Sequence, residues 1–398
     1  MSAKKVEDVV ILGGGVLGFS IAYHLAKEGI RSQVIEMDSI GARASGKSDG
    51  MIGGAVGMFF YTGGDMRSML PFGRESYRWF QQLYLELKEK TGLEIQYAVC
   101  SFLHCALSEE EEKAFPLIAS EARSEGLDVK WISGDEARSL EHVLTSEVRG
   151  ALLGECAQVE PYRYTLALAQ EAESLGASIK YAQAVGFRCN RNRVTAIKLS
   201  TGRDITAGTI VIAMGPWSRQ AASWLGIRLP VNTVRAQTLK MVAPKHPKYQ
   251  LTFTPPAVGE WPRVFMIVSP RVDGTLLVGY TEDITETWDD SRPETWSDSP
   301  SAEMRDIIVE HAVRFVPVLE NAMLVEQRAA VLGYPPAGRM VMGPVPEWKN
   351  VYIAMVGDGG TGLSPVVGRI MTDLIVGGDR ARKAIEEVKS ISPAKFVS

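Results

Sequence analysis

Residues 9–18, with the sequence VVILGGGVLG, decide the fold of this chain. The four apolar residues at 9–12 predict a buried parallel strand, which ends at a G-x-G-x-x-G pattern formed by Gly13, Gly15 and Gly18. In such a pattern the first glycine permits a tight turn and the second lets a pyrophosphate approach the backbone. The third lets the following helix pack closely on the strand.

A helix and a second strand are expected after these glycines. Apolar residues at helical spacing predict a helix over residues 17–28 that ends at Gly29 and directs its positive end at phosphates. A strand over 33–36 ends in Glu36, whose carboxylate can accept hydrogen bonds from ribose hydroxyls. This order predicts a dinucleotide site, with a purely structural glycine turn as the alternative. The pattern alone leaves NAD and FAD both open.

The composition bounds the class of protein. A chain of 398 residues allows two or three domains at roughly 150 residues each. The net charge of −4 argues against a general nucleic-acid-binding protein, which would carry a basic face. No apolar run approaches the roughly 18 residues of a membrane helix, and the short polar N-terminus does not resemble a signal peptide. The predicted location is therefore cytoplasmic.

Cysteine and histidine spacing gives no sign of a metal site. The four cysteines, Cys100, Cys105, Cys156 and Cys189, form no C-x-x-C pair and are predicted to be reduced, buried thiols. The five histidines show neither H-x-x-x-H nor H-E-x-x-H spacing, so we predict no metal.

The first half of the chain alternates helical and strand-like segments. A loop of small residues over 41–54 suits a backbone wrapped around a flat ligand, and it leads into a helix over about 73–90. Strand-like residues 96–107 precede an acidic helix over 108–126, for which Ser108 is the expected N-cap.

The second half predicts both parallel and antiparallel strands. Period-2 segments between residues 230 and 324 predict an antiparallel sheet. A last apolar strand over 351–355 runs into a glycine-rich turn and a helix from about Pro365 to Val376. The remaining expected elements are a helix over 161–176, strands over 179–185, 194–199, 209–212, 238–242, 264–268 and 275–279, and a helix over 301–315.

Three separated segments resemble the D-amino-acid oxidase (DAO) family of FAD-dependent oxidoreductases, in the branch of glycine oxidase, sarcosine oxidase and the β-subunits of heteromeric amino-acid dehydrogenases. The first combines the N-terminal glycines, Glu36 and the loop from Ala44 to Gly50. The second and third are Gln158-Val159-Glu160-Pro161 with Ala213-Met214-Gly215-Pro216-Trp217-Ser218, and Gly343-Pro344-Val345-Pro346, Asn350-Val351-Tyr352 and Gly359-Gly360-Thr361-Gly362-Leu363-Ser364-Pro365 with Gly368-Arg369. Together they span nearly the whole chain.

The resemblance implies an α/β (α+β) fold with a Rossmann-like βαβ unit and a second domain on an antiparallel sheet. The FAD-binding domain would be discontinuous and comprise residues 1–90, 156–230 and 325–398. The substrate domain would comprise residues 91–155 and 231–324.

The resemblance also implies which residues contact FAD. The N-terminal glycines would hold the pyrophosphate, Glu36 the adenosine ribose and Val185 the adenine side. The backbone of Gly359 to Leu363, at a helix N-terminus, would stabilise negative charge on the reduced flavin. The full set is Gly13, Gly15, Val16, Leu17, Gly18, Glu36, Met37, Ala44, Ser45, Gly50, Met51, Ile52, Val185, Ala213, Gly215, Trp217, Gly359, Gly360, Thr361, Gly362 and Leu363.

Two departures from the family pattern bear on the substrate and on flavin attachment. Glycine-oxidase-like members bind the substrate carboxylate through an arginine near a Thr-Pro-Asp-Gly stretch; here Leu332 takes the place of the arginine, and Pro336-Ala337-Gly338 replaces the end of the stretch. The cysteine that attaches flavin in monomeric sarcosine oxidases corresponds to about Ala330, so non-covalent FAD is expected.

No catalytic acid or base is assigned. Candidate substrate contacts are Arg328, Arg235, Arg339, Tyr280, Tyr334, Tyr61 and Trp261, each with an ion-pairing or packing role as the alternative.

The resemblance implies oxidation of the C–N bond of a small amino acid or secondary amine, of the glycine, sarcosine, proline or D-amino-acid type. Hydride would pass to flavin N5, and the product imine would hydrolyse. Oxygen, a quinone or a partner subunit would reoxidise the flavin, in a homo- or hetero-oligomer. A 2-hydroxy acid dehydrogenase and a non-catalytic FAD-bearing subunit remain alternatives, and an NAD enzyme is the least favoured.

Overall fold

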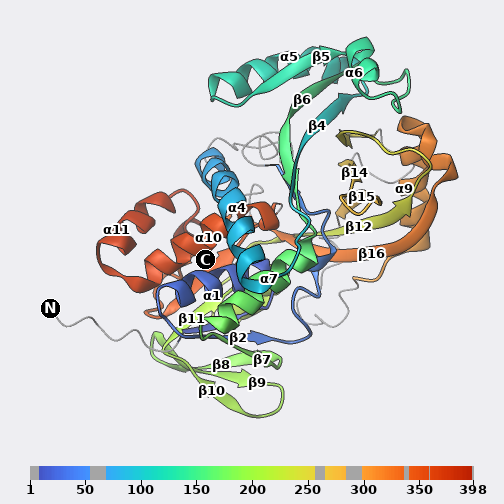
Figure 1. Ribbon diagram of the computed structural model, residues 1–398. Helices are drawn as coiled ribbons and strands as arrows, with labels where there is room; N and C mark the ends of the chain where they lie inside the picture. Colours follow the sequence, from blue (N-terminus) through green and yellow to red (C-terminus); the bar gives the residue numbers. More distant parts are fainter. Residues whose placement is uncertain are drawn as a thin grey trace.

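The computed structural model describes residues 9–53, 69–255, 265–283, 298–335, 340–357 and 359–396. Its strands form three sheets, which we call sheets A, B and C. Figure 1 shows sheet A under a layer of helices, with sheet C below it and sheet B rising to one side.

Sheet A contains β1, the strand that precedes the first glycine-rich segment. Its six strands lie in the order β17-β18-β11-β1-β2-β7, and all are parallel except the edge strand β17, which runs antiparallel to β18. Parallel strands covered on both faces read as unbroken apolar runs, and each residue of β1 is buried. The bounds are β1 Val9–Leu12, β2 Ser32–Glu36, β7 Ser178–Tyr181, β11 Thr209–Ile212, β17 Val341–Pro344 and β18 Val351–Met355.

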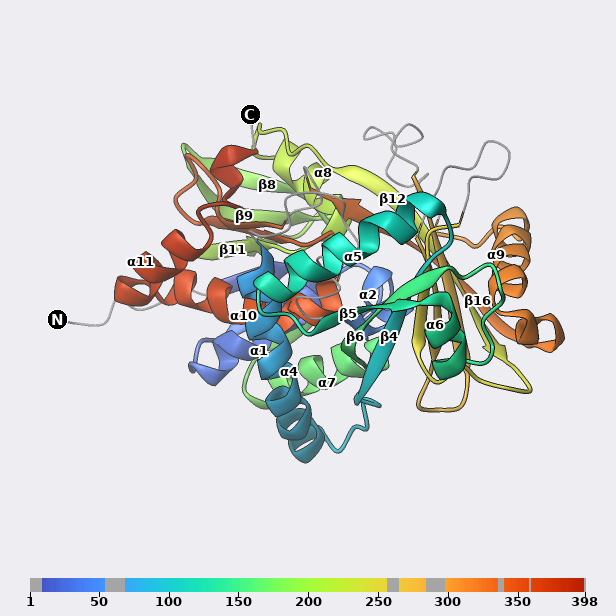
Figure 2. The same cartoon turned by 90° about the horizontal axis from the view of Figure 1, so that it is seen from above.

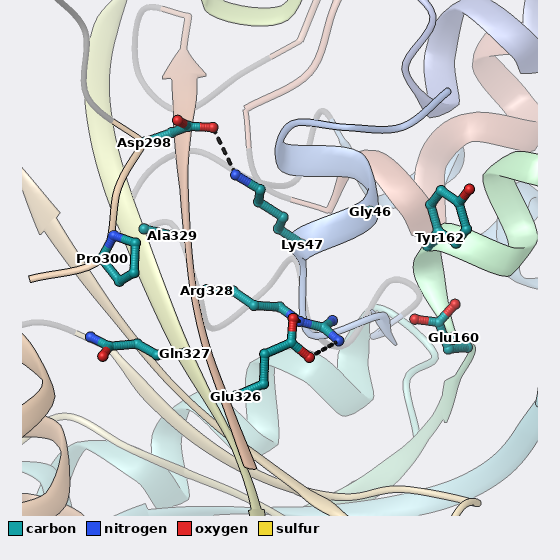
Figure 3. Close-up of a pocket in the computed structure, with 10 residues that line it drawn as sticks. All are labelled: Gly46, Lys47, Glu160, Tyr162, Asp298, Pro300, Glu326, Gln327, Arg328 and Ala329. Atoms are coloured by element: carbon teal, nitrogen blue, oxygen red, sulfur yellow. Dashed lines mark hydrogen bonds and ion pairs between the residues drawn. The ribbon is translucent and has the colours of Figure 1, made fainter. Parts of the chain in front are cut away.

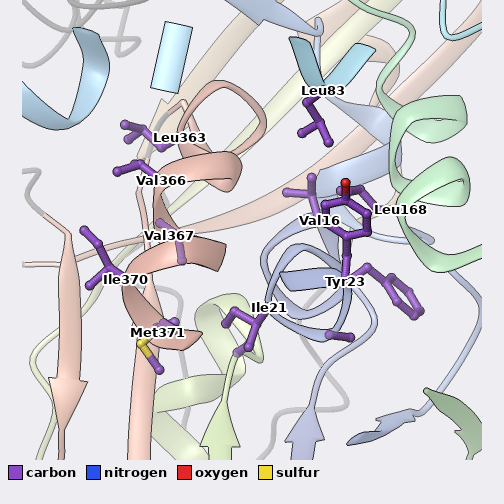
Figure 4. Close-up of a cluster of buried hydrophobic side chains, with 14 of the residues drawn as sticks. Val16, Ile21, Tyr23, Leu83, Leu168, Leu363, Val366, Val367, Ile370 and Met371 are labelled. Carbon is purple, nitrogen blue, oxygen red and sulfur yellow. The ribbon is translucent and has the colours of Figure 1, made fainter. Parts of the chain in front are cut away.

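Helices cover one face of sheet A and sheet C covers the other. Helix α10 packs on α1 and α4, and α1 packs on α7. Their facing side chains, among them Ile21, Leu83, Leu168 and Val367, form one buried cluster (Figure 4). The helices are α1 Val16–Lys27, α4 Leu70–Thr91, α7 Pro161–Ser174, α10 Gly360–Val376 and α11 Gly378–Glu387. Sheet C consists of β8 Ala184–Asn190, β9 Arg193–Leu199 and β10 Asp204–Thr206.

Sheet B is built almost wholly from antiparallel pairs. The order is β16-β12-β15-β14-β13-β4-β6-β3, with β5 also paired to β6, and among the described strands of this sheet only the β13–β4 pair is parallel. The strands are β3 Met51–Ile52, β4 Ala98–Ala106, β5 Val129–Ser133, β6 Gly150–Gln158, β12 Asn232–Val242, β13 Gln250–Phe253, β14 Met266–Pro270, β15 Leu276–Asp283 and β16 Met323–Tyr334.

In the described ranges, three α-helices accompany sheet B. They are α5 Glu109–Ser124, α6 Gly134–Leu140 and α9 Ala302–Phe315. Helix α9 packs its buried residues against strands β12 to β15 and lies at the opposite end of the molecule from α11 (Figure 2). Ser108 caps α5 as predicted, since its side chain accepts from the Glu111 amide while Glu111 bonds back to the Ser108 amide.

The predicted mixed fold, with a parallel βαβ unit and a separate antiparallel sheet, is confirmed. The predicted domain division stays a prediction. Two of its boundaries, after residues 155 and 324, fall inside β6 and β16, and β3 joins the N-terminal segment to sheet B. In the described part of the chain, no helix combines the length and apolar character needed to cross a bilayer.

Several expected element boundaries are wrong. Strand β12, expected to begin at residue 238, begins at Asn232. Helix α10 begins at Gly360, not near Pro365. Pro365 has no N–H to donate to the Thr361 carbonyl, and the Ser364 hydroxyl donates to this carbonyl instead, at 2.8 Å. The helix can therefore include the proline. The strand expected over 179–185 is split into β7 and β8, because the chain leaves sheet A after Tyr181 and joins sheet C.

Candidate functional site

The glycine turn after β1 lies where the parallel strands of sheet A have their C-terminal ends. We call this side of the sheet the edge of sheet A. The Ala213 amide donates to the Leu12 carbonyl at 2.9 Å, which ties the end of β11 to that of β1. A Cβ atom on Gly13, whose φ is +106°, would collide with the Ala213 carbonyl. A Cβ atom on Gly18 would collide with the Gly13 carbonyl. Ligands of open α/β sheets bind in the crevice at this edge.

Glu36 is held in place by the backbone of two loops. Its Oε2 accepts from the Gly14 amide at 2.7 Å and its Oε1 from the Asp38 amide at 2.8 Å, and the residue is 8% exposed. Each carboxylate oxygen keeps a second lone-pair direction, which suits two vicinal hydroxyls. Gly14 was not among the predicted cofactor residues. In the structure a Cβ atom on Gly14 would lie only 2.9 Å from the Glu36 side chain, so a glycine is needed here. Met37 follows Glu36 and is 40% exposed.

The loop after β2 folds back onto the N-terminus of α1. The short helix α2, Ala44–Lys47, places the Ser45 hydroxyl to accept from the Val16 amide at 2.9 Å. The other first-turn amides of α1, including that of Leu17, have no acceptor within the helix and suit an anion. Ser45 also lies against Gly15, whose Cβ would come within 2.9 Å of the hydroxyl.

Arg43 is a second residue that sequence reasoning missed. It bonds to Asp298 at 3.0 Å and to Asp38 at 3.2 Å, and its guanidinium lies 5.8 Å from the ring centroid of Trp217. Trp217 ends the 3-10 helix η2, Gly215–Trp217, so Arg43 spans the gap between two predicted cofactor segments. An isolated arginine in a polar loop carries no sequence signal for such a position.

Arg271 joins the loop over residues 49–52 to sheet B. It lies at the end of the β14 hairpin and donates Nη1 to the Asp49 carbonyl at 2.7 Å and Nη2 to the Val159 carbonyl. Burial lowers the pKa of Arg271 and raises the pKa of Asp49. Gly50, with φ of +69°, allows this approach because its Cβ would collide with the Val159 carbonyl.

The N-terminus of α10 meets the same loop. Gly359 has a φ of +73°, and a Cβ on Gly360 would meet no atom of the described residues within 4 Å, so among these residues nothing crowds the turn. A Cβ on Gly362 would lie 3.5 Å from Ile52, so these two predicted residues are neighbours. Thr361 and Leu363 lie in the same first turn. The partial positive charge of the helix end therefore lies beside the residues that follow Gly50.

Val185 is placed by sheet C. It lies in β8 and is 45% exposed. Three residues earlier, the Ala182 amide donates to the Glu36 carbonyl at 2.7 Å. The start of β8 therefore lies close to Glu36.

Arg328 lines a cavity of about 340 Å³ between α2, the start of α7 and β16 (Figure 3). Its Nε and Nη2 each donate to Glu326 at 2.7 Å, and this pairing raises the pKa of Arg328. Across the cavity, Lys47 bonds to Asp298 at 2.7 Å. The cavity wall therefore pairs its cations with its own carboxylates.

Strand register separates the other substrate candidates. Paired residues of β12 and β16 share a sheet face, so Leu332, opposite Val234, points away from the face of Arg235, which is opposite Val331. Tyr334 lies beside the approach to α10, since a Cβ on Gly357 would be 3.1 Å from its ring. Arg339, Tyr61, Trp261 and the side chain of Tyr280 lie outside the described residues.

The family model described as FAD dependent oxidoreductase matches residues 8–374. This chain belongs to the DAO family of FAD-dependent oxidoreductases. Among relatives of this DAO chain, glycine oxidase of Bacillus licheniformis is 26% identical over 97% of this chain and 98% of its own. Glycine oxidase of Geobacillus kaustophilus is 28% identical over 92% of each chain. Its crystal structure superposes with a TM-score of 0.82, at 25% identity, over 93% of this chain and 94% of its own.

The residues present fit FAD. The edge of sheet A has a glycine cradle that a Cβ would fill at Gly13 and an oriented carboxylate at Glu36. The open N-terminus of α10 lies further along. FAD is the cofactor of this DAO chain, and the roles of individual residues stay predictions. Within the described ranges, no group of three or more His, Cys, Asp or Glu side chains could hold a metal ion. Of the cysteines, Cys105 and Cys156 are buried as expected, whereas Cys189 is exposed.

Proposed function

We propose that this chain uses FAD to oxidise the C–N bond of a small amino acid or secondary amine. The observation that carries the proposal is the likeness to glycine oxidases over more than nine-tenths of the chain, in both sequence and structure. This likeness favours amine oxidation over the 2-hydroxy acid and non-catalytic alternatives.

The proposed roles follow from the edge of sheet A. First-turn amides of α1 would bind the pyrophosphate, and Glu36 would accept from the ribose hydroxyls. Bound FAD supplies a hydride acceptor, and the N-terminus of α10 would stabilise the negative charge that results. The protein itself would position a neutral amine and exclude water, and these two tasks require no general base.

We further propose that the substrate is not held by the bidentate arginine clamp of glycine-oxidase-like enzymes. By the family resemblance Leu332 corresponds to the position of that arginine. Arg328 lies on the same strand face and is paired with Glu326. A leucine side chain offers neither a hydrogen bond nor a positive charge to a substrate carboxylate. Amines without a carboxylate should therefore compete well with amino acids.

The test is an anaerobic absorbance titration of the FAD-loaded protein. The panel contains glycine, sarcosine, proline, D-amino acids, an N-methyl alkylamine matched to sarcosine in size, and the 2-hydroxy acids glycolate and lactate. Bleaching of the flavin band by any amine supports the proposal, and comparison of sarcosine with the alkylamine measures the value of the carboxylate. Bleaching only by 2-hydroxy acids, or by no compound, would overturn it.

The electron acceptor that reoxidises the flavin is proposed from the named relatives. We propose oxygen as the acceptor, by analogy with the relatives named oxidases. Admitting air to the bleached protein tests this, because a fast return of the band with peroxide release supports it. A quinone or a partner subunit, an oligomer and a cytoplasmic location stay predictions.

A further inference from the structure

Cys100 and Cys156 lie opposite one another on neighbouring strands of sheet B. They form a direct pair in the register of β4 and β6, and their Sγ atoms are 3.4 Å apart. Directly paired residues of antiparallel strands have Cα atoms about 4.5–5.5 Å apart. A disulfide needs Cα atoms about 4.4–6.8 Å apart, so this backbone can accept the bond without moving.

The two thiols differ in access and in acidity. Cys156 is fully buried, whereas Cys100 is partly exposed. The Cys156 hydrogen bond lowers the pKa of Cys100, and the Gln250 amide, 3.7 Å from Cys100 Sγ, and the buried charge of Arg271 act in the same direction. Because the thiolate is the reactive form, Cys100 is the thiol suited to react first.

The pair adjoins the proposed flavin-binding loop. Cys156 is two residues before Gln158, which pairs with Met51 of β3. In the next residue, Val159, the carbonyl accepts a hydrogen bond from Arg271, and the amide donates one to the Gly50 carbonyl at 3.0 Å. Strand pairing and these hydrogen bonds therefore connect the thiol pair to the loop.

We propose that Cys100 and Cys156 are a peroxide-oxidisable thiol pair that closes to a cross-strand disulfide. The Cys100 thiolate attacks hydrogen peroxide, the O–O bond breaks, and the sulfur becomes a sulfenic acid while hydroxide takes a proton and leaves as water. The Cys156 thiol then attacks the Cys100 sulfur and gives up its proton, and a second water leaves. Two thiols thus supply the two electrons that reduce one peroxide.

The test adds hydrogen peroxide to the reduced, FAD-loaded protein without substrate, so its outcome does not depend on the proposed amine oxidation. After catalase treatment the protein is denatured, alkylated, digested without reductant and analysed by mass spectrometry. We expect Cys100 and Cys156 to lose alkylation together. A linked peptide, lighter by two hydrogens than its parts, should appear and should be lost on reduction with dithiothreitol.

Variants separate the two steps. With Cys156→Ser, peroxide should leave Cys100 as a sulfenic acid that dimedone traps, with no linked peptide. With Cys100→Ser, the buried Cys156 should stay alkylatable after denaturation. Cys105→Ser is the matched control, since Cys105 lies in the same strand opposite Ala151 and its loss should leave the link unchanged.

Two results in the wild-type protein would overturn the proposal. One is oxidation confined to the exposed Cys189, with Cys100 and Cys156 both fully alkylated. The other is conversion of Cys100 to a sulfinic acid without any linked peptide, which would mean that Cys156 cannot reach it.

Discussion

The edge of sheet A and the face of β16 hold the two halves of the proposed site by different means. At the edge, the contacts come from the backbone: the Gly14 amide orients Glu36, and Gly359 opens the turn into α10. On β16 they come from side chains: the family resemblance predicts that Leu332 replaces an arginine, and Arg328 is paired with Glu326. A backbone site depends on glycines that no other residue replaces, whereas a side-chain site can change its chemistry by one substitution.

The largest effect is expected from Gly18→Ala at the edge. The added methyl group would collide with the Gly13 carbonyl, so α1 must move away from β1 and the turn must distort. We expect loss of FAD binding and of most of the stability, measured by flavin absorbance after gel filtration and by thermal unfolding. Gly29→Ala is the control, because its added Cβ meets no described atom within 4 Å and only its φ of +73° costs energy, about 1–2 kcal/mol. Equal FAD content in both variants would contradict the backbone account.

Arg271, which joins the loop over residues 49–52 to sheet B, should be nearly as sensitive. Arg271→Met removes the hydrogen bonds to the buried Val159 carbonyl and to the partly buried Asp49 carbonyl. At about 1–3 kcal/mol for a buried group and less for a partly buried one, the free energy of unfolding should fall by about 3 kcal/mol. Urea unfolding measures it. Arg314→Met, which breaks an exposed pair with Glu147, should cost under about 1 kcal/mol, and similar losses in the two variants would refute the assignment.

On β16 a single change should alter specificity. Leu332→Arg restores a cation at the position of the family's carboxylate clamp. A hydrogen bond to a charged group is worth about 1.5–3 kcal/mol, so KM for sarcosine should fall about tenfold or more, with little change for the matched alkylamine. Steady-state kinetics of the two substrates measures the difference. Leu332→Met is the size control. A parallel change for both substrates would show that residue 332 does not face the substrate.

The comparison also explains what could be predicted from the sequence. The strand, Gly13 to Gly18 and Glu36 were predictable because the local order of residue types fixes that geometry. Arg43 and Arg271 were not, since each acts on segments far along the chain: Arg271 reaches the Asp49 carbonyl across 222 positions. The Cys100–Cys156 pair was likewise invisible, because only the register of β4 and β6 brings the two thiols together.

The smallest effect is expected at the exposed end of the hairpin that carries Arg271. Burial raises the pKa of Asp273, but hydrogen bonds from Thr275 and Lys240 outweigh it and bring the pKa from 3.8 to about 2. Since the folded pKa is the lower one, this carboxylate stabilises the fold above 3.8, and its contribution is lost as the pH falls towards 2. Asp273→Asn should therefore cost about 1 kcal/mol near neutral pH, because the pair with Lys240 is only partly exposed, and the Asn side-chain oxygen can still accept from Thr275. Urea unfolding of both proteins in steps from neutral to acidic pH should show the difference shrinking below pH 3.8, and a difference that grows there would reverse the assigned sign.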